Sequence, residues 1–294
     1  MKQLIMKLKN FLLELVIFSF LFRNMKCDVL LNRYNLGNLC KCNPFEVIEI
    51  NLDSKSISSI DTSTFRALAS VLESLSLRGN ELKTIDSATF HGLASLQLLS
   101  LDSNQLKSIS ETTFKDLNAL QWLLLSYNQL KTVDSSLFKS LTSLQFLYLN
   151  NNQLKSIDSV TFKYLTSLQE VYLNDNQIES IDPATFNGLI SLKSLWLKNN
   201  QISSIDSATF NGLTALEGLY LYDNHIKVID SSTFDGLASI QELYLKNNEL
   251  RTIDPTPFYY LKSLKTLSLK GNKISLIERI VLKRYLYFIN KLEL

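Results

Sequence analysis

Few residues in this chain of 294 carry side chains whose type and spacing suit catalysis. The two histidines, His91 and His225, are accompanied by no metal-ligand cluster, phosphate-binding glycine loop or nucleophile motif. Aspartates recur after an isoleucine or, once, a valine, at Asp86, Asp134, Asp158, Asp182, Asp206, Asp230 and Asp254. A carboxylate repeated in one register is typical of a residue that caps a turn. The sequence therefore predicts no enzyme, no metal and no cofactor.

Three cysteines, Cys27, Cys40 and Cys42, lie close together near the N-terminus. Their clustering at one end favours a disulfide-stabilised cap over a zinc site, which usually requires four ligands. Because three is an odd number, one thiol is left over. It is free, paired with another chain, or lost with a signal peptide that is cleaved after Cys27.

Residues 1–26 differ from the rest of the chain. Lys2, Lys7 and Lys9 precede an apolar run over residues 11–22, which is shorter than the roughly 20 residues of a membrane span. This pattern predicts a secretory signal and a secreted or extracellular protein, with a buried N-terminal helix as the alternative. No later stretch is apolar enough to cross a bilayer, so we expect no membrane span.

The elements that must position the remaining side chains follow from an internal repeat. Asparagines recur 24 residues apart at Asn80, Asn104, Asn128, Asn152, Asn176, Asn200, Asn224, Asn248 and Asn272. Phenylalanines recur with the same period at Phe90, Phe114, Phe138, Phe162, Phe186, Phe210, Phe234 and Phe258. Around each asparagine the chain reads L-x-x-L-x-L-x-x-N-x-L, as in residues 144–154. Such a period predicts a repeat protein.

Each part of the repeat has a physical role. The L-x-L piece alternates with period two, which predicts a short strand with its leucines on one face. One strand per repeat, always approached from the same direction, predicts a parallel sheet whose stacked units bury one another's leucines. The asparagine amide donates and accepts hydrogen bonds, so it can satisfy backbone groups where the chain turns inward.

This motif resembles the extracellular leucine-rich-repeat family, in its typical 24-residue subclass of Toll-, Slit- and proteoglycan-like ectodomains. The resemblance covers residues 47–276, about ten units of which the first is degenerate. It implies an α/β leucine-rich-repeat solenoid, a curved horseshoe with a concave parallel β-sheet and short helical turns on the convex side. It also implies a binding module rather than an enzyme.

The two ends depart from the family pattern. Residues 27–46 resemble the N-terminal cap of the family, which normally has four cysteines rather than three. In residues 277–294, apolar side chains fall at helical spacing after a capping box formed by Ser275 and Glu278. We expect a C-terminal capping helix that shields the last strand, or alternatively a truncated repeat. The apolar side chains are Ile277, Val281, Tyr285, Phe288 and Leu292.

An aromatic stripe is the strongest candidate for a binding site. Five consecutive repeats place an aromatic residue between the paired leucines, at Tyr148, Tyr172, Trp196, Tyr220 and Tyr244, and neighbouring positions add Trp122, Phe146 and Tyr222. On parallel strands about 4.8 Å apart, the five would extend roughly 19 Å along the concave face. Aromatic residues also stabilise sheets by cross-strand packing. Tyr and Trp nevertheless dominate interface anchors, so we expect a ligand-binding surface for a protein.

A second register is basic. Lys83, Lys107, Lys131 and Lys155 occupy equivalent positions just past the asparagine turn in four consecutive repeats. They could bind a sulfated glycan or another polyanion, although lysine at a surface turn is also the ordinary solvated choice.

The overall charge narrows the choice of partners. Lys and Arg number 30 against 28 Asp and Glu, which argues against a nucleic-acid partner. Three functions remain: an extracellular protein-recognition module that uses the concave face, a matrix or sulfated-glycan-binding protein that uses the lysine register, and an intracellular scaffold. We favour the first.

Overall fold

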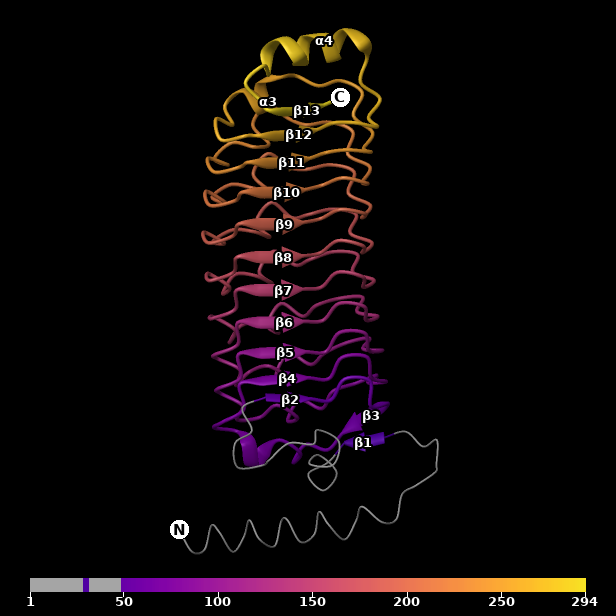
Figure 1. Ribbon diagram of the computed structural model, residues 1–294, viewed down its shortest axis with the longest axis vertical. Coiled ribbons are helices and arrows are strands. Elements are labelled where there is room, and N and C mark those ends of the chain that lie inside the picture. The colour runs from indigo at the N-terminus through magenta and orange to yellow at the C-terminus, as the bar shows by residue number, and fades with distance from the viewer. Residues whose placement is uncertain (1–28, 32–48) are drawn as a thin grey trace, which may run out of the picture.

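The computed structural model describes residues 29–31 and 49–294, and its main element is one parallel sheet of 11 strands (Figure 1). The strands lie in chain order along the sheet, and each pairs in parallel with its sequence neighbours. Their bounds are β2 Glu49–Asn51, β4 Ser74–Ser76, β5 Leu98–Ser100, β6 Trp122–Leu124, β7 Phe146–Tyr148, β8 Glu170–Tyr172, β9 Ser194–Trp196, β10 Gly218–Tyr220, β11 Glu242–Tyr244, β12 Thr266–Ser268 and β13 Lys291–Glu293. The solenoid and its parallel sheet are as predicted.

The sequence repeat is also the structural register. Leu147 pairs with Val171, and Leu195 pairs with Leu219, so residues 24 positions apart lie side by side on adjacent strands. The central residue of each strand from β2 to β12 is buried in the core, and its two flanking residues turn to the opposite face. Every second position along a strand therefore lines one continuous surface.

The asparagine ladder closes each turn. The Asn152 side chain donates from Nδ2 to the carbonyl oxygens of Leu125 and Leu149, each at 3.0 Å, and its Oδ1 accepts the Leu130 N–H at 3.0 Å. Because Leu125 and Leu130 belong to the preceding repeat, one amide satisfies buried backbone groups of two units. This is the role predicted from the sequence.

The return segments consist mostly of hydrogen-bonded turns. Asp182 is typical, because its Oδ1 accepts the Ala184 N–H at 2.8 Å and its carbonyl accepts the Thr185 N–H at 3.0 Å. Among the described return segments, only η1 (Arg66–Leu68) and α3 (Thr256–Tyr259) are assigned as helical turns. The predicted helical turns are thus reduced to single turns capped by aspartate in most repeats.

A ladder of buried phenylalanines fills the outer half of the core. Its members are almost entirely inaccessible to solvent, and neighbours stack with ring centroids 6.2 Å apart for Phe162 and Phe186. We call this set the outer ladder; it comprises Phe65, Phe90, Phe114, Phe138, Phe162, Phe186, Phe210, Phe234 and Phe258. The repeated phenylalanine is therefore a core residue, as predicted.

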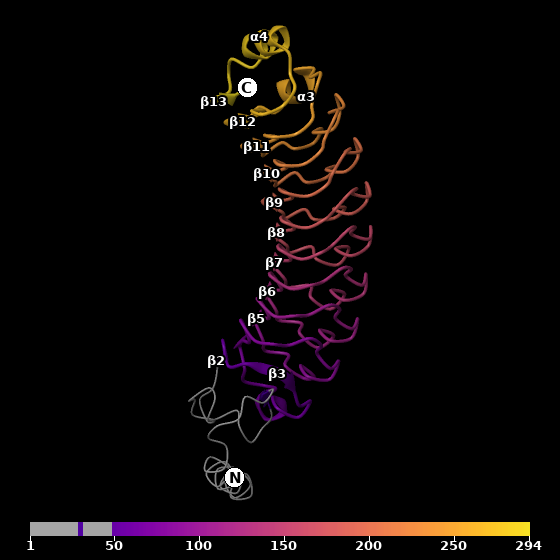
Figure 2. The same ribbon diagram turned by 90° about the vertical axis from the view of Figure 1, so that its right-hand side faces the viewer.

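The solenoid is gently bowed, and the side view shows the strands along its concave side (Figure 2). The bulkier return segments lie on the convex side, where they need more room per repeat than the strands. The sheet thus presents an elongated, inward-curving surface, which is the surface that the predicted aromatic stripe occupies.

At the N-terminal end, β1 (Val29–Leu31) pairs in parallel with β3 (Ile57–Ile60). The predicted signal over residues 1–26 and the cysteines Cys27, Cys40 and Cys42 lie outside the described residues. Across the part of the chain that is described, no helix has the length and apolar character needed to span a membrane.

The C-terminal end combines a helix with an additional strand. Helix α4 (Leu276–Tyr285) begins at the capping box of Ser275 and Glu278, and β13 then adds to the sheet beside β12. The predicted apolar helix face was wrong: Ile277 is 75% exposed and Tyr285 is 53% exposed.

The opposite face of α4 carries its packing. Leu282 and Leu286 are fully buried, and Ile289 follows them into the core. The helix has apolar residues on both faces, and i, i+4 spacing alone does not distinguish the face that packs. The element also ends earlier than predicted, because residues 291–293 are extended in β13.

Candidate functional site

Strands β7 to β11 bring five aromatic side chains into one continuous stack on the concave face. Ring centroids are 4.3 Å apart for Tyr148 and Tyr172, 5.5 Å for Tyr172 and Trp196, 3.6 Å for Trp196 and Tyr220, and 5.3 Å for Tyr220 and Tyr244. The ring planes are nearly parallel, within 7–13° of one another. All five side chains are half-buried. We call these residues the concave ladder.

Small residues beside the ladder let its rings lie down against the sheet. A Cβ atom placed on Gly218 would lie 2.9 Å from both Cε2 and the hydroxyl oxygen of Tyr220. The absence of that atom allows the tyrosine ring to cover the backbone of its own strand. The equivalent position on the preceding strand is Ser194, another small residue. The ladder is therefore built by the residues next to the aromatics as well as by the aromatics themselves.

Two carboxylates orient the ladder hydroxyls, and sequence reasoning did not identify them. Tyr172 donates its hydroxyl to Glu170 Oε2 at 2.6 Å, and Tyr220 donates to Glu242 Oε2 at 2.9 Å. Burial raises the pKa of both tyrosines, and the hydrogen bond and negative charge of the glutamate raise it further. Both phenols thus stay protonated, and each holds a carboxylate at the rim of the stack.

The other predicted aromatics form two smaller contacts. Trp122 and Phe146 stack with centroids 3.7 Å apart and planes 15° apart. Tyr222 contacts Tyr244 edge-on at 6.3 Å, and Lys198 Nζ lies 5.6 Å from the Tyr222 ring centroid. The predicted aromatic residues therefore lie on adjoining strands but form two separate stacks, with Tyr222 against the edge of the longer one.

A shallow pocket lies on the loops that lead into the middle strands. It encloses about 430 Å³. Gln169 Nε2 donates to Gln145 Oε1 at 3.0 Å within this lining. The lining residues are Gln145, Ser167, Gln169, Ser191, Lys193 and Ala215. Glutamines 24 residues apart, such as Gln145 and Gln169, recur in the sequence and could have indicated this polar lining.

A buried carboxylate distinguishes the N-terminal half of the concave side. Asp102 is 9% exposed, and its Oδ1 accepts the Ser126 N–H at 2.7 Å. Burial raises the pKa of Asp102 to about 6, against the lowering effect of that hydrogen bond. On β4 and β5, the position that carries an aromatic residue in the concave ladder is occupied by Ser76 and Ser100. Asp102 follows β5, so its carboxylate lies outside the concave ladder.

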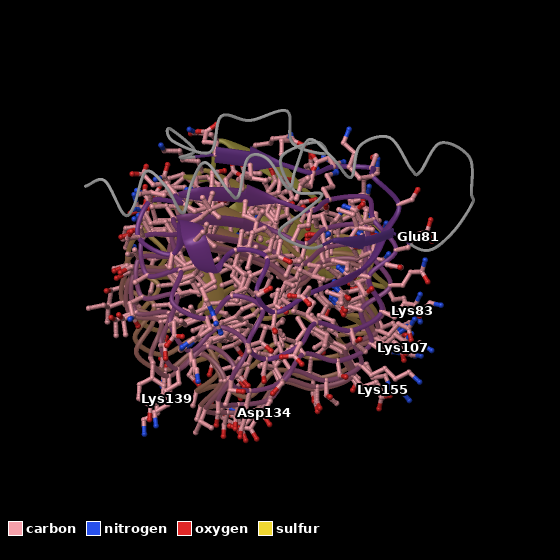
Figure 3. The ribbon with its side chains drawn as sticks, turned by 90° about the horizontal axis from the view of Figure 1, so that it is seen from below. Glu81, Lys83, Lys107, Asp134, Lys139 and Lys155 are labelled. Carbon is pink, nitrogen blue, oxygen red and sulfur yellow. The ribbon has the colours of Figure 1, made fainter. Side chains whose placement is uncertain are left out.

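The lysine register lies on a flank of the solenoid. Figure 3, which looks along the solenoid, shows Lys83, Lys107 and Lys155 on the same flank, with their side chains directed outward. These lysines and Lys131 are exposed, and the ion pairs found among the described residues include none of the four. The structure brings the register together as a row of solvated charges.

The histidines make exposed polar contacts. His91 Nδ1 is hydrogen-bonded to Asp116, and His225 Nδ1 lies 3.1 Å from Glu249 Oε1. Within residues 29–31 and 49–294, no group of three or more His, Cys, Asp or Glu side chains is placed to hold a metal ion.

Comparison with known proteins identifies the repeat. The family model described as leucine rich repeat matches seven overlapping segments that together run from residue 46 to residue 284. Comparison with curated proteins gives no match.

Solved structures of similar fold include chains from three complexes. A chain of the TLR13–ssRNA13 complex is 30% identical, with a TM-score of 0.79 over 90% of this chain and 38% of its own. A chain of the Toll–Spatzle complex of Drosophila is 22% identical, with a TM-score of 0.75; the match covers 83% of this chain and 33% of the Toll–Spatzle chain. A chain of the complex of Latrophilin 3, Unc5D and the leucine-rich repeats of FLRT2 is 24% identical, with a TM-score of 0.71. That match covers 83% of this chain and 81% of the other.

This chain therefore spans less than two fifths of the TLR13 and Toll chains that it matches. The seven family matches cover most of the sequence, including the strands β4 to β12 and the asparagine ladder described above. The chain belongs to the leucine-rich-repeat family.

Proposed function

We propose that this protein is an extracellular recognition module that binds a protein ligand through the concave ladder. The observation that carries the proposal is the uninterrupted stack of five half-buried aromatic side chains on β7 to β11. Stacked rings lose little conformational entropy when a partner covers them, so a preformed stack favours tight association. Serine replaces the aromatics at the same register on β4, β5 and β12.

The rim of the ladder supplies polar specificity. Glu170 and Glu242 each present a carboxylate held by a tyrosine hydroxyl, and they lie three strands apart on the same side of the stack. Such carboxylates accept hydrogen bonds from lysine, arginine or backbone N–H groups. We therefore propose a ligand segment that places an apolar or aromatic centre on the rings and two hydrogen-bond donors along one side of the stack, three strands apart.

The structural relatives support a binding role. The Toll chain was solved with Spatzle, and the FLRT2 repeats were solved with Latrophilin 3 and Unc5D. Location outside the cell is part of the proposal and has its own test, because a secreted protein would appear in the culture medium of cells that express the full chain.

The experiment compares the wild type with a Tyr172→Ser, Trp196→Ser, Tyr220→Ser variant in capture of an array of purified cell-surface and matrix proteins. The matched control carries Tyr127→Ser, Tyr164→Ser and Tyr260→Ser, which remove exposed aromatic rings outside the ladder. We expect a partner that the control keeps and the ladder variant loses. A partner that both variants keep would contradict the proposal.

Single-stranded RNA is a second candidate ligand, favoured by one observation. The near-zero net charge predicted no nucleic-acid partner, yet the TLR13 chain that is 30% identical over 90% of this chain was solved with ssRNA13. Overall charge is therefore a weak ground for exclusion. Binding of a labelled RNA oligonucleotide at low and high salt tests this candidate, since phosphate contacts weaken steeply with salt. RNA binding lost on Lys83→Gln, Lys107→Gln, Lys131→Gln substitution would place it on the lysine register instead of the ladder.

A further inference from the structure

The C-terminal end of the solenoid carries most of the exposed large apolar side chains found among the described residues. Eight of the fourteen belong to residues 259–287, although the described part of the chain before residue 259 contains many more residues. Four of these lie on α4: Leu276 is 74% exposed, Ile277 75%, Ile280 60% and Val281 36%. We call these four the apolar ridge. A contiguous exposed apolar surface of this kind marks an interaction site.

The ridge is placed at the extremity of the molecule. Helix α4 lies across the C-terminal end of the solenoid, beyond β12 and β13 on the long axis (Figure 1). Its buried residue, Leu282, faces the core, and at about 100° per residue Ile277 and Ile280 lie on the far side of the helix. A flat surface can therefore reach the ridge without contacting the rest of the protein.

The C-terminal segment that contains the ridge has an excess of positive charge. Residues 251–294 contain nine Lys or Arg and three Asp or Glu, a net charge of +6, whereas the whole chain carries +2. On α4 itself Lys283 and Arg284 are exposed, and neither belongs to an ion pair found in the described part of the chain. The end of the solenoid is thus both apolar and strongly basic.

Tyrosines frame the same surface. Tyr287 is 83% exposed and contacts Phe288 edge-on at 6.2 Å, and Phe288 in turn contacts Tyr259 at 6.4 Å. Lys262 Nζ lies 4.3 Å from the Tyr259 ring centroid. Tyrosine rings with adjacent lysines are enriched where a protein meets the boundary between lipid headgroups and acyl chains.

From this combination we propose that the apolar ridge docks on an anionic lipid surface. Aliphatic side chains enter the interface, while Lys283, Arg284 and the tyrosines contact the headgroups. A second copy of the chain is the less suitable occupant, because two ridges face to face would bring two ends of like charge together. The ridge and the concave ladder lie on different elements, so this proposal is independent of the proposed function.

Vesicle co-sedimentation of the full chain tests the proposal, with phosphatidylcholine vesicles that contain or lack phosphatidylserine. Two ridge variants are compared, Ile277→Ser with Ile280→Ser and Lys283→Gln with Arg284→Gln. Matched controls make comparable changes at exposed positions elsewhere: Ile190→Ser with Val228→Ser, and Lys115→Gln with Lys139→Gln. Thermal unfolding verifies that each variant folds.

We expect the wild type to bind only vesicles that contain phosphatidylserine. Loss of Lys283 and Arg284 should weaken binding about 30-fold, at about fivefold for each charge. Loss of Ile277 and Ile280 should weaken it at least about tenfold. The controls should bind like the wild type. No binding to anionic vesicles, equal losses in the controls, or unchanged binding in the ridge variants would overturn the proposal. Self-association that the Ile277→Ser, Ile280→Ser variant abolishes would assign the ridge to a second copy instead.

Discussion

The outer ladder and the concave ladder are two stacks of aromatic rings with the same 24-residue period, yet they differ in nearly every physical property. The outer phenylalanines are almost wholly buried, and the ring centroids of a typical pair lie 6.4 Å apart. The concave rings are half-buried, their centroids approach to 3.6 Å at the closest, and two of them, Tyr172 and Tyr220, donate their hydroxyls to glutamates. One period thus produces a structural element on one side of the solenoid and an accessible surface on the other.

Groups that lower stability occur on both sides of the solenoid. Next to the outer phenylalanines, six buried threonine hydroxyls have no hydrogen-bond partner among the described residues: those of Thr89, Thr113, Thr161, Thr185, Thr209 and Thr233. The concave side has such groups too. The Trp196 indole N–H is buried and has no hydrogen-bond acceptor among the described residues. Asp102 is buried as a carboxylate, and Tyr127 adopts a φ of 55°, in the left-handed region that favours glycine or asparagine.

The largest expected effect is a difference between the two ladders in how much a lost ring lowers the free energy of unfolding. Phe162→Ala should lower the free energy of unfolding by about 3–5 kcal/mol, because it leaves a cavity in a rigid core. Tyr172→Ala should lower it by only about 1–2 kcal/mol, since the ring is half-exposed and loses mainly its stacking contacts. Denaturant unfolding of both variants measures the difference. Equal losses would mean that the concave ladder is a structural element as well.

The buried carboxylate gives a pH-dependent effect of intermediate size. The pKa of Asp102 is about 6 in the folded protein against an ordinary value of 3.8, so the folded state binds the proton more tightly than the unfolded chain. The corresponding stability is present below about pH 4 and is lost as the pH rises through about 6.

Asp102→Asn should therefore raise the free energy of unfolding by about 1–2 kcal/mol at neutral pH and leave it unchanged near pH 4. The amide oxygen of asparagine can still accept the Ser126 N–H. Unfolding curves at the two pH values measure the effect, and a gain that is the same at both would refute the assignment.

The packing of the concave ladder depends on Gly218. Gly218→Ala should displace the Tyr220 ring, whose Cε2 would lie 2.9 Å from the new Cβ, and should cost about 1 kcal/mol in lost stacking. The control is Ser194→Ala at the equivalent position of β9, which should be neutral. Tryptophan fluorescence reports the change, because Trp196 stacks on Tyr220. An unchanged spectrum in the glycine variant would show that the ring does not depend on the glycine.

The smallest effect concerns the turn beside the concave face. Tyr127 has a positive φ, and the equivalent residues of three later repeats are Asn151, Asn199 and Asn247 with φ of 50–56°. Tyr127→Asn should raise the free energy of unfolding by about 0.5–1 kcal/mol, because asparagine tolerates this conformation better. Thermal unfolding measures it, and a loss of stability would mean that the tyrosine ring makes a stabilising contact.

Much of this architecture could be predicted from the sequence because it is periodic. The leucines, the outer phenylalanines and Asn152 with its equivalents occupy fixed registers, and each register has one physical role. The parts that could not be predicted depend on side-chain direction. The hydrogen bonds of Glu170 and Glu242 depend on the directions of the Tyr172 and Tyr220 rings, of which the latter lies over Gly218, and no repeat pattern encodes these directions.

The C-terminal helix illustrates the other limit. Ile277, Val281 and Tyr285 have the same spacing as Leu282 and Leu286, so periodicity allowed either face of α4 to pack. The structure buries the second set, because Ile289 continues it into the core before the chain enters β13.

The most direct test of the account is the affinity of a captured protein ligand for the wild type, the Tyr172→Ser, Trp196→Ser, Tyr220→Ser variant and the Tyr127→Ser, Tyr164→Ser, Tyr260→Ser control. Calorimetric titration of each folded protein supplies the three dissociation constants. Because central aromatic anchors each contribute about 2 kcal/mol or more, the ladder variant should bind at least about 30-fold more weakly while the control binds like the wild type. Equal affinity for all three proteins would contradict the claim that the concave ladder is the recognition surface.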